Sequence, residues 1–260
     1  MMIGSWGTQK PPEGSQVNRG HPLARGLDAY WLMNEGGGRV LRDIAGNYTG
    51  TGRSTSARGV GRYGRHTKFS NAPNDNYDTT YTKALNDFTV LAWFYGDSTC
   101  VATARILDKV YTTGFWLGRN NTSTSNLWTA GCLQSSLPYG TQVTLSDNQW
   151  HMFGQSRSGT QQTVIGDGQN LATATVGSTA LSPASLSIGG VISGGGTPLT
   201  GAISQVIVWS RALVASEYLS LYNNPYAMIA PPAATKFYSY AAAVATGNRR
   251  RRILCAGRTM

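Results

Sequence analysis

The eight residues Phe88-Thr-Val-Leu-Ala-Trp-Phe-Tyr95 decide the fold class of this chain. They are aromatic and β-prone residues, which favour strands, and the turn-prone pairs Asn86-Asp87 and Gly96-Asp97 bound them. Apolar residues occupy both alternating sets of positions, so both faces of the strand are expected to be buried. The stretch therefore predicts a central strand of a β-sheet.

Shorter runs of the same kind lie on both sides of this stretch, separated by clusters of turn residues. They predict strands at residues 27–33, 105–110, 114–118, 126–133, 142–145, 150–156, 163–166, 185–189 and 202–209. Asp167-Gly168 is the dipeptide expected in a short turn between two paired strands. Only residues 212–223 have helical spacing, with Ser216 as the expected N-cap and Pro225 as a stop. The pattern predicts an all-β sandwich with one short C-terminal helix.

The composition agrees with a β-rich chain. Glycine accounts for 32 of 260 residues, and charged residues for 13%, against about 25% in an average domain. This balance disfavours helical bundles and coiled coils. Seven Trp, 13 Tyr and six Phe provide enough apolar surface for a packed core, which argues against a disordered chain.

The formal net charge of +10 is concentrated in two segments. The first, residues 53–68, has no acid and five basic side chains: Arg53, Arg58, Arg62, Arg65 and Lys68. The second follows Tyr226 and has six basic residues, four of them in the run from Arg249 to Arg252. The other 11 basic residues are balanced by all 12 acids, so the rest of the chain is nearly neutral. Nucleic acid is therefore not an expected partner.

The ends of the chain differ in composition from its middle. Residues 1–20 are rich in Gly, Pro, Ser and Gln and predict an extended N-terminal arm. Residues 21–227 are expected to form the sandwich, and residues 228–260 a basic C-terminal tail. No apolar stretch has the length of a signal peptide or a membrane span, so no membrane association is expected.

Four blocks of sequence resemble, in order and spacing, the laminin-G-like, concanavalin A-like jelly-roll family. They are Gly26-Leu-Asp-Ala-Tyr-Trp-Leu-Met-Asn-Glu-Gly-Gly-Gly38 with Asp43-Ile-Ala-Gly-Asn47, Gly61-Arg-Tyr-Gly64 with Phe88 to Phe94, Gln149-Trp-His-Met-Phe153 with Asp167-Gly168, and Leu186-Ser-Ile-Gly-Gly190 with Gly201-Ala-Ile-Ser-Gln-Val-Ile-Val-Trp-Ser-Arg-Ala-Leu213. The resemblance covers residues 22–225 and implies a concanavalin A-like jelly-roll β-sandwich with extended arms. Such a fold is expected to bury Trp31, Trp93, Trp150 and Trp209 in its core, with sugar stacking as the alternative.

No catalytic pattern accompanies the resemblance. The glucanases of this fold carry a Glu-x-Asp-x-x-Glu strand, but this chain has only Glu13, Glu35 and Glu217, none in such a strand. Gly59-Val-Gly-Arg-Tyr-Gly64 matches a dinucleotide-binding string, yet no strand is predicted before it and no helix after it. We therefore expect a protein that is not an enzyme.

One loop, Asn74-Asp75-Asn76-Tyr77-Asp78, is the predicted ligand site. The resemblance implies calcium as the common cofactor of the family, bound by loop oxygens, with Asp75 and Asp78 as the metal ligands. Calcium requires six or more oxygens, and Ser204 and Gln205 stand where related domains often carry an acid. A solvated turn without metal is the alternative, and a glycan is the other ligand expected at this loop.

The C-terminal tail is the predicted partner-docking segment. Arg249, Arg250, Arg251 and Arg252 are preceded by Tyr238 and Tyr240. Arginine donates in a forked geometry that suits carboxylates as well as phosphates, so docking on an acidic protein surface is one interpretation. A freely solvated tail is the other.

These features together lead to two functional hypotheses. The first is a non-enzymatic bacteriophage virion structural protein, a capsid decoration or tail-appendage component anchored by its arms. It would be present in several copies or as a homo-oligomer, with the major capsid protein or tail proteins as partners, in virions assembled in the host cytoplasm. Three features support this hypothesis. The chain is nearly neutral outside its two basic segments, no secretion signal is expected, and Leu221-Tyr-Asn-Asn-Pro-Tyr226 resembles the ends of laminin-G-like phage structural proteins. The alternative is a carbohydrate-binding lectin, with or without calcium, in which residues 74–78 and an exposed Tyr or Trp engage host or environmental glycans.

Overall fold

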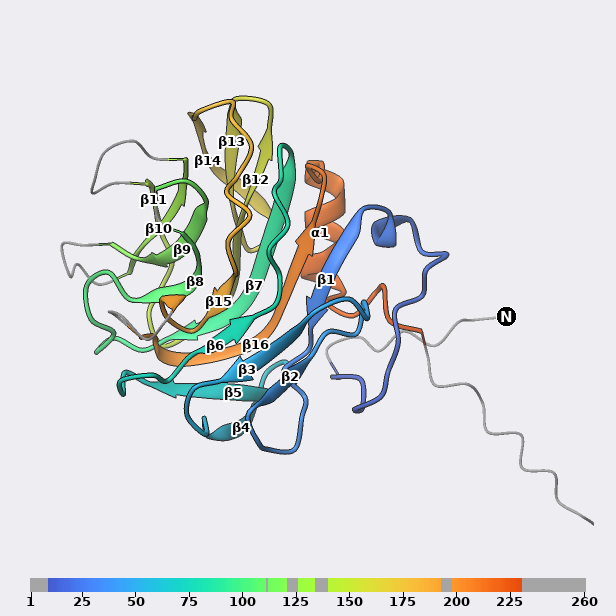
Figure 1. The fold of residues 1–260 in the computed structure, drawn as a ribbon, viewed down its shortest axis with the longest axis vertical. Coiled ribbons are helices and arrows are strands. Elements are labelled where there is room, and N and C mark those ends of the chain that lie inside the picture. Colours follow the sequence, from blue (N-terminus) through green and yellow to red (C-terminus); the bar gives the residue numbers. More distant parts are fainter. Residues whose placement is uncertain (1–8, 111, 121–125, 134–139, 193–197, 231–260) are drawn as a thin grey trace, which may run out of the picture.

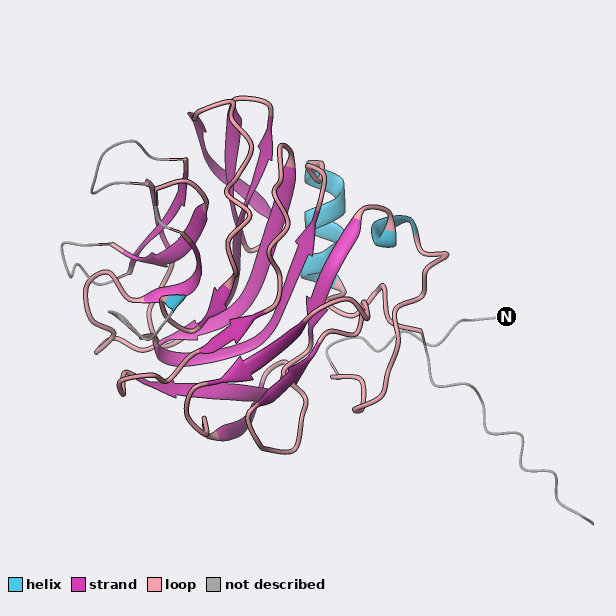
Figure 2. Ribbon diagram, in the orientation of Figure 1, coloured by secondary structure: helices cyan, strands magenta, loops and turns pink. Residues whose placement is uncertain are grey.

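The described residues of the chain form two antiparallel β-sheets of eight strands each, packed face to face (Figure 1). The structure is a computed structural model that describes residues 9–110, 112–120, 126–133, 140–192 and 198–230. Figure 2 shows how few helical residues accompany the strands. The predicted all-β sandwich with one short C-terminal helix is confirmed.

The first sheet has the strand order β14-β13-β12-β7-β16-β5-β4, and β1 also pairs with β16. Its strands are β1 (Leu27–Trp31), β4 (Arg58–Gly61), β5 (Gly64–Ser70), β7 (Phe88–Gly96), β12 (Trp150–Ser158), β13 (Gln161–Gly166), β14 (Gln169–Thr175) and β16 (Thr200–Trp209). The strand predicted from Phe88 to Tyr95 is β7, which pairs with β12 on one side and β16 on the other. Its central position is confirmed.

The second sheet has the strand order β11-β10-β9-β8-β15-β6-β3-β2. Its strands are β2 (Val40–Arg42), β3 (Thr49–Gly52), β6 (Tyr77–Thr79), β8 (Arg105–Lys109), β9 (Phe115–Arg119), β10 (Leu127–Cys132), β11 (Thr141–Thr144) and β15 (Ser187–Ile188). Neighbours such as β6, β15 and β8 are far apart in sequence, because the chain passes repeatedly from one sheet to the other.

Both faces of the first sheet are covered around β7. Phe88, Val90, Ala92 and Phe94 point into the core between the two sheets. Leu91 and Trp93, at the alternate positions, belong to a second apolar cluster on the outer face of the first sheet. The alternating apolar residues from Phe88 to Phe94 thus serve two different cores.

The outer cluster is closed by α1 (Ala215–Asn223), by the short 3-10 helix η1 (Pro22–Ala24) and by both ends of the described chain. α1 contacts β14, and its Tyr218 and Leu221 belong to the outer cluster. The expected N-cap at Ser216 is wrong, because α1 begins at Ala215 and Val214 is its N-cap. The Glu217 carboxylate accepts the Val214 amide at 3.0 Å and pairs with Arg211, and so occupies the helix start in place of a hydroxyl.

The two described ends of the chain pair with each other on the sandwich. Val17 forms an isolated bridge with Ile229, the Asn18 amide donates to the Met228 carbonyl at 2.7 Å, and the Ala230 amide donates to the Gln16 carbonyl at 3.0 Å. Val17, Met228 and Ile229 are buried. The packed part of the chain therefore extends beyond residues 21–227 at both ends.

Candidate functional site

A cleft of about 770 Å³ opens on the outer face of the first sheet, where β7 ends and β16 begins. Strands β4, β5, β7, β12 and β16 all contribute to it, and its volume lies within the range typical of ligand sites. We call it the Trp150 cleft. Its lining includes Ser56, His66, Lys68, Ser70, Asp75, Tyr95, Asp97, Trp150 and Thr200.

The indole of Trp150 is the centre of an aromatic cluster in this cleft. Its ring centroid lies 5.1 Å from that of His66 and 5.9 Å from those of Tyr63 and Tyr95. A Cβ at Gly61 would lie 3.1 Å from the Trp150 indole nitrogen, so the glycine allows β4 to approach the ring closely. Trp150 and Tyr95 are only partly buried, which leaves apolar ring surface open to solvent.

The expected burial of four tryptophans holds for three of them. Trp31, Trp93 and Trp209 are fully buried. Trp150 is only partly buried: it packs against the edge of the outer cluster and also lines the cleft. Among these four tryptophans, Trp150 is therefore the one to which the alternative of sugar stacking still applies.

Serine hydroxyls and a buried carboxylate build a second wall of the cleft. Asp75 accepts the Ser56 hydroxyl at 2.8 Å, and it accepts the amide of Ser70 at 2.8 Å and its hydroxyl at 3.0 Å. The carboxylate therefore ties the loop before β4 to the end of β5. This wall presents hydroxyl groups whose positions are already fixed.

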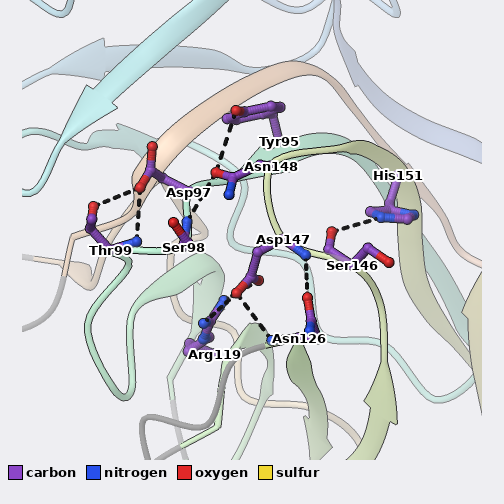
Figure 3. A network of polar contacts seen from close by, with 10 residues as sticks. All are labelled: Tyr95, Asp97, Ser98, Thr99, Arg119, Asn126, Ser146, Asp147, Asn148 and His151. Carbon is purple, nitrogen blue, oxygen red and sulfur yellow. Dashed lines mark hydrogen bonds and ion pairs between the residues drawn. The ribbon is translucent and has the colours of Figure 1, made fainter.

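A polar network fixes the 145–149 loop, which joins β11 to β12 and ends next to Trp150 (Figure 3). The buried Arg119 and Asp147 side chains form a two-point ion pair, with Arg119 Nη2 at 2.8 Å from Asp147 Oδ2. The backbone amide of Asn126 donates to the Asp147 carboxylate at 3.1 Å. The Asn148 side chain accepts from the Ser98 amide at 3.2 Å and from the Tyr95 hydroxyl at 3.5 Å. The network holds the rim of the cleft next to Tyr95.

The titratable groups of the cleft differ in their charge. The Thr99 hydroxyl and amide lower the pKa of Asp97, so this carboxylate is ionised at neutral pH. Burial lowers the pKa of His66, so its imidazole is neutral there. Lys68 is exposed at the edge. The cleft thus combines aromatic surface with hydroxyls, one ionised acceptor and one cationic donor.

The predicted ligand loop, residues 74–78, does not act as one unit. Asn74 is exposed with a φ of 65°, Asp75 lines the Trp150 cleft, and Tyr77 is fully buried in the core between the sheets. The Asn76 amide group donates to Asp78 at 2.9 Å and to Ser187 at 3.0 Å, and Asp78 pairs with Arg53 at 2.6 Å. Only Asp75 of the five belongs to the cleft.

These residues do not fit the calcium ion that the family resemblance implied. The oxygens of Asp75 accept serine and amide donors, whereas Asp78 is held by Arg53 and Asn76. Within the described ranges, no group of three or more His, Cys, Asp or Glu side chains is arranged to hold a metal. A calcium ion would have to displace donors that already occupy both carboxylates.

The predicted docking residues of the tail, Tyr238, Tyr240 and Arg249 to Arg252, lie outside the described residues. Among the described residues, no helix has the length and apolar character of a membrane span.

Two site residues, Tyr95 and His66, were not singled out from the sequence as ligand groups. Tyr95 is the last aromatic residue of the strand predicted by residues 88–95 and precedes a Gly-Asp turn, so its position at a sheet end was visible. The sequence did not show that Tyr95 lies near Trp150, because that contact depends on the pairing of β7 with β12, where Trp150 lies opposite Tyr95.

The fold and the cleft together define a β-sandwich with an open aromatic site on one sheet. Residues 70–217 match a laminin G family described as the concanavalin A-like lectin/glucanases superfamily. Because the match covers more than half of the chain, this protein belongs to that family. Among curated proteins, none matches the chain.

Solved structures with the same fold come from proteins of several kinds. Trypanosoma rangeli sialidase in complex with sialic acid has a TM-score of 0.60 at 19% identity, covering 77% of this chain and 33% of that one. Domain 4 of AbnA, a GH43 extracellular arabinanase from Geobacillus stearothermophilus, in complex with arabinotriose, has a TM-score of 0.57 at 16% identity, covering 75% and 98%. The botulinum neurotoxin type G receptor binding domain has a TM-score of 0.58 at 14% identity, covering 76% and 51%. The chain thus spans about a third of the sialidase, and at these identities the likeness concerns the fold alone.

Proposed function

We propose that this protein is a carbohydrate-binding module whose ligand stacks on Trp150. The observation that carries the proposal is the partly exposed indole, held among three aromatic rings in a cleft of about 770 Å³ with hydroxyl and carboxylate groups on its walls. A sugar ring presents apolar C–H groups on its faces and hydroxyls at its edge. Such a ligand matches a cleft that offers apolar ring surface and fixed polar groups together.

Two of the structural neighbours support a saccharide as the ligand. The sialidase structure contains sialic acid, and the arabinanase domain contains arabinotriose. Because a shared fold does not carry a shared function, this support is an analogy, and the Trp150 cleft bears the main weight of the proposal.

The cleft is suited to binding without hydrolysis. Glycoside hydrolysis requires a carboxyl group that holds a proton near neutral pH, which needs a raised pKa. The pKa of Asp97 is instead lowered by Thr99, and the Asp75 carboxylate is an acceptor for serine hydroxyls. Neither group is placed as a proton donor to a leaving group.

The direct test is a glycan array probed with the natural protein and with Trp150→Ala, followed by titration calorimetry on the best ligand. Loss of the stacking surface is expected to weaken binding at least about 10-fold. Leu171→Ala, which removes a partly exposed apolar side chain of β14 outside the cleft, is the control and should bind normally. The proposal fails if no glycan binds, or if Trp150→Ala binds as well as the natural protein.

Removal of metal provides a separate test of the site. Binding should be unchanged by a chelator, because Asp75 and Asp78 are already bonded to protein donors. The same array repeated with and without chelator gives the answer. A loss of binding that added calcium restores would reinstate the predicted metal site at residues 74–78.

A virion role remains a second candidate, and the pairing of the chain ends is the observation that favours it. Residues 16–18 and 228–230 bond each other on the sandwich, so a C-terminal segment used as an anchor would leave from a firmly packed point. A lectin displayed on a particle would satisfy both candidates.

Deletion of residues 231–260 tests the anchor and keeps Met228 and Ile229, which are buried. The truncated protein should fold and bind glycans but no longer copurify with particles; normal incorporation would contradict the anchor.

A further inference from the structure

A second cleft, of about 760 Å³, lies beside the Trp150 cleft. Both are lined by Val60 and Gly61 of β4, so only one strand of the β4–β5 hairpin separates them. Val60 is 80% exposed and lies at this boundary without cover. The shared lining makes the two clefts neighbours, and we call the second one the Arg65 cleft.

The far wall of the Arg65 cleft is the N-terminal segment, which is anchored to the sandwich. The ammonium group of Lys10 donates to the Ser204 hydroxyl at 3.0 Å and to the carbonyls of Ser204 and Arg65. The Asn34 side chain donates to the Pro11 carbonyl at 3.0 Å. Gly64 has a φ of 76°, and a Cβ there would meet the Lys10 side chain at 2.4 Å. The wall is therefore a packed part of the protein.

The basic segment 53–68 divides into two groups in the structure. Arg53 is bound to Asp78 at 2.6 Å, and Arg58 contacts Thr67 and packs over the Tyr77 ring at 5.8 Å. The other three members are exposed and line the two clefts: Lys68 in the Trp150 cleft, and Arg62 and Arg65 in the Arg65 cleft. Of these, Arg62 also packs over the Tyr63 ring at 5.4 Å. In the described part of the chain, none of these three forms an ion pair.

The acids of the two clefts, in contrast, have donors of their own. Asp97 is bonded to Thr99, Asp75 to serine hydroxyls, and Glu13 lies 3.9 Å from Arg42. Serine and threonine are neutral donors and do not compensate the charge of a carboxylate, so positive charge prevails only in the Arg65 cleft. There Arg62 and Arg65 of the β4–β5 hairpin face a single acid, Glu13, which lies near Arg42. An anion would gain most by lying against this hairpin.

We infer that the two clefts form one groove for an acidic oligosaccharide. One sugar ring lies on Trp150, and carboxylate or sulfate groups further along the chain lie against Lys68, Arg62 and Arg65. This inference rests on the proposed function of the Trp150 cleft and extends it to the class of ligand. Arginine forks suit such planar or tetrahedral oxyanions, and two adjoining clefts suit a chain of sugars better than a single one.

The experiment compares an oligogalacturonate with its fully methyl-esterified form, which has the same rings and no charge. Calorimetry should show the acidic form binding about 10-fold more tightly at low salt, with the difference shrinking as salt is added. The triple variant R62Q/R65Q/K68Q should lower binding of the acidic form to the level of the ester and leave the ester unaffected. K83Q, which removes a cation paired with Asp28 outside the groove, is the matched control. Pairs of sialylated and asialo glycans, and of sulfated and unsulfated glycans, repeat the comparison for other acids.

The outcomes separate the inference from the proposed function. Equal binding of charged and neutral forms, lost in Trp150→Ala, overturns the inference and leaves the carbohydrate-binding function standing. Failure to bind any glycan overturns both. Single-stranded DNA is the polyanion control: if it binds as tightly as the acidic glycan and Trp150→Ala does not weaken that glycan, the hairpin is a nonspecific cationic surface and the inference is overturned.

Discussion

The outer face of the first sheet consists of two regions that carry the same kinds of residue and differ in what covers them. In one region Trp93 and Trp209 are fully buried beneath α1 and the paired chain ends. In the other, Trp150 and Tyr95 remain partly exposed at the wall of a cleft. Trp150 and Tyr95 lie opposite each other, two residues along β12 and β7 from the Met152 and Trp93 pair. Two steps along adjacent strands thus separate a structural tryptophan from a candidate ligand-binding one.

The difference shows that the cover of a sheet face decides the role of an aromatic side chain. A buried ring loses contact with water when the chain folds and stabilises the folded state. A ring left at a cleft wall keeps apolar surface that only a ligand can cover. Substitutions in each region should therefore affect different properties, stability in the covered region and binding in the cleft.

The largest expected effect is that of Trp93→Ala. Trp93 has no exposed surface, so the variant leaves a cavity in the outer cluster and should lose about 3–5 kcal/mol of unfolding free energy. Urea denaturation measures this loss. Trp150→Ala, measured in the same way, should lose much less unfolding free energy. Equal losses for the two variants would show that Trp150 is as important for stability as Trp93.

Asp147→Ala should have the next largest effect. It leaves the buried Arg119 guanidinium without its carboxylate partner, which should destabilise the protein by about 3 kcal/mol. Thermal or chemical unfolding measures the change, and glycan binding should weaken as well because the 145–149 loop borders the cleft. Replacing both residues by Leu should recover part of the lost stability, since no buried charge then lacks a partner.

Trp150→Phe should change binding more than stability. The smaller ring keeps an aromatic surface in the cleft but covers less of a sugar, so we expect affinity to fall by about fivefold, near 1 kcal/mol. The unfolding free energy should change by less than that amount, because the ring is only partly buried. A variant that loses stability and keeps affinity would show that Trp150 is structural.

The smallest effect is expected from the titration of His151, which borders the 145–149 loop. Its ring nitrogens lie 2.6 Å from the Asp167 carboxylate and 2.9 Å from the Ser146 carbonyl, two acceptors that only a protonated imidazole satisfies together. Burial lowers the pKa of His151, but the hydrogen bond and charge of Asp167 and the Ser146 carbonyl outweigh burial, and the pKa is raised.

A raised pKa in the folded state stabilises the protein most below the ordinary imidazole pKa of 6.5, and this stabilisation is lost as the pH rises through the raised value. We expect the unfolding free energy to fall by up to about 1 kcal/mol as the pH rises from below 6.5 to above the raised pKa of His151. Unfolding measured across the window, in the natural protein and in His151→Gln, checks the prediction. A pH dependence that persists unchanged in the variant would assign it to another group.

The strand and turn chemistry was readable in the sequence because it depends on neighbouring residues. The apolar residues on both faces of β7 predicted a strand buried on both sides, and both cores are present. Asp167 and Gly168 have φ values of 48° and 80°, as a tight turn between β13 and β14 requires. The cap of α1 was missed because Glu217 reaches back from the first turn, a side-chain contact that Ser216 obscured.

The candidate site was less predictable, because it is assembled from five strands. The loop 74–78 has the composition of a ligand site, but its side chains alternate between the cleft, the core and an ion pair with Arg53. Strand geometry from residue 77 onward sends adjacent side chains to opposite faces, so oxygen-rich neighbours in sequence do not converge in space.

Local sequence pattern and composition were enough to predict ten of the 16 described strands, the tight turn, the absence of a glucanase motif and the concentration of positive charge in residues 53–68, whereas β2 to β6 and β14 were not predicted. The partial exposure of Trp150, and the lack of an ion pair at Arg62, Arg65 and Lys68 among the described residues, became visible in the tertiary structure. The physical reason is that accessibility and charge compensation depend on what packs over a residue, and for Trp150 and the β4–β5 hairpin those partners come from distant parts of the chain.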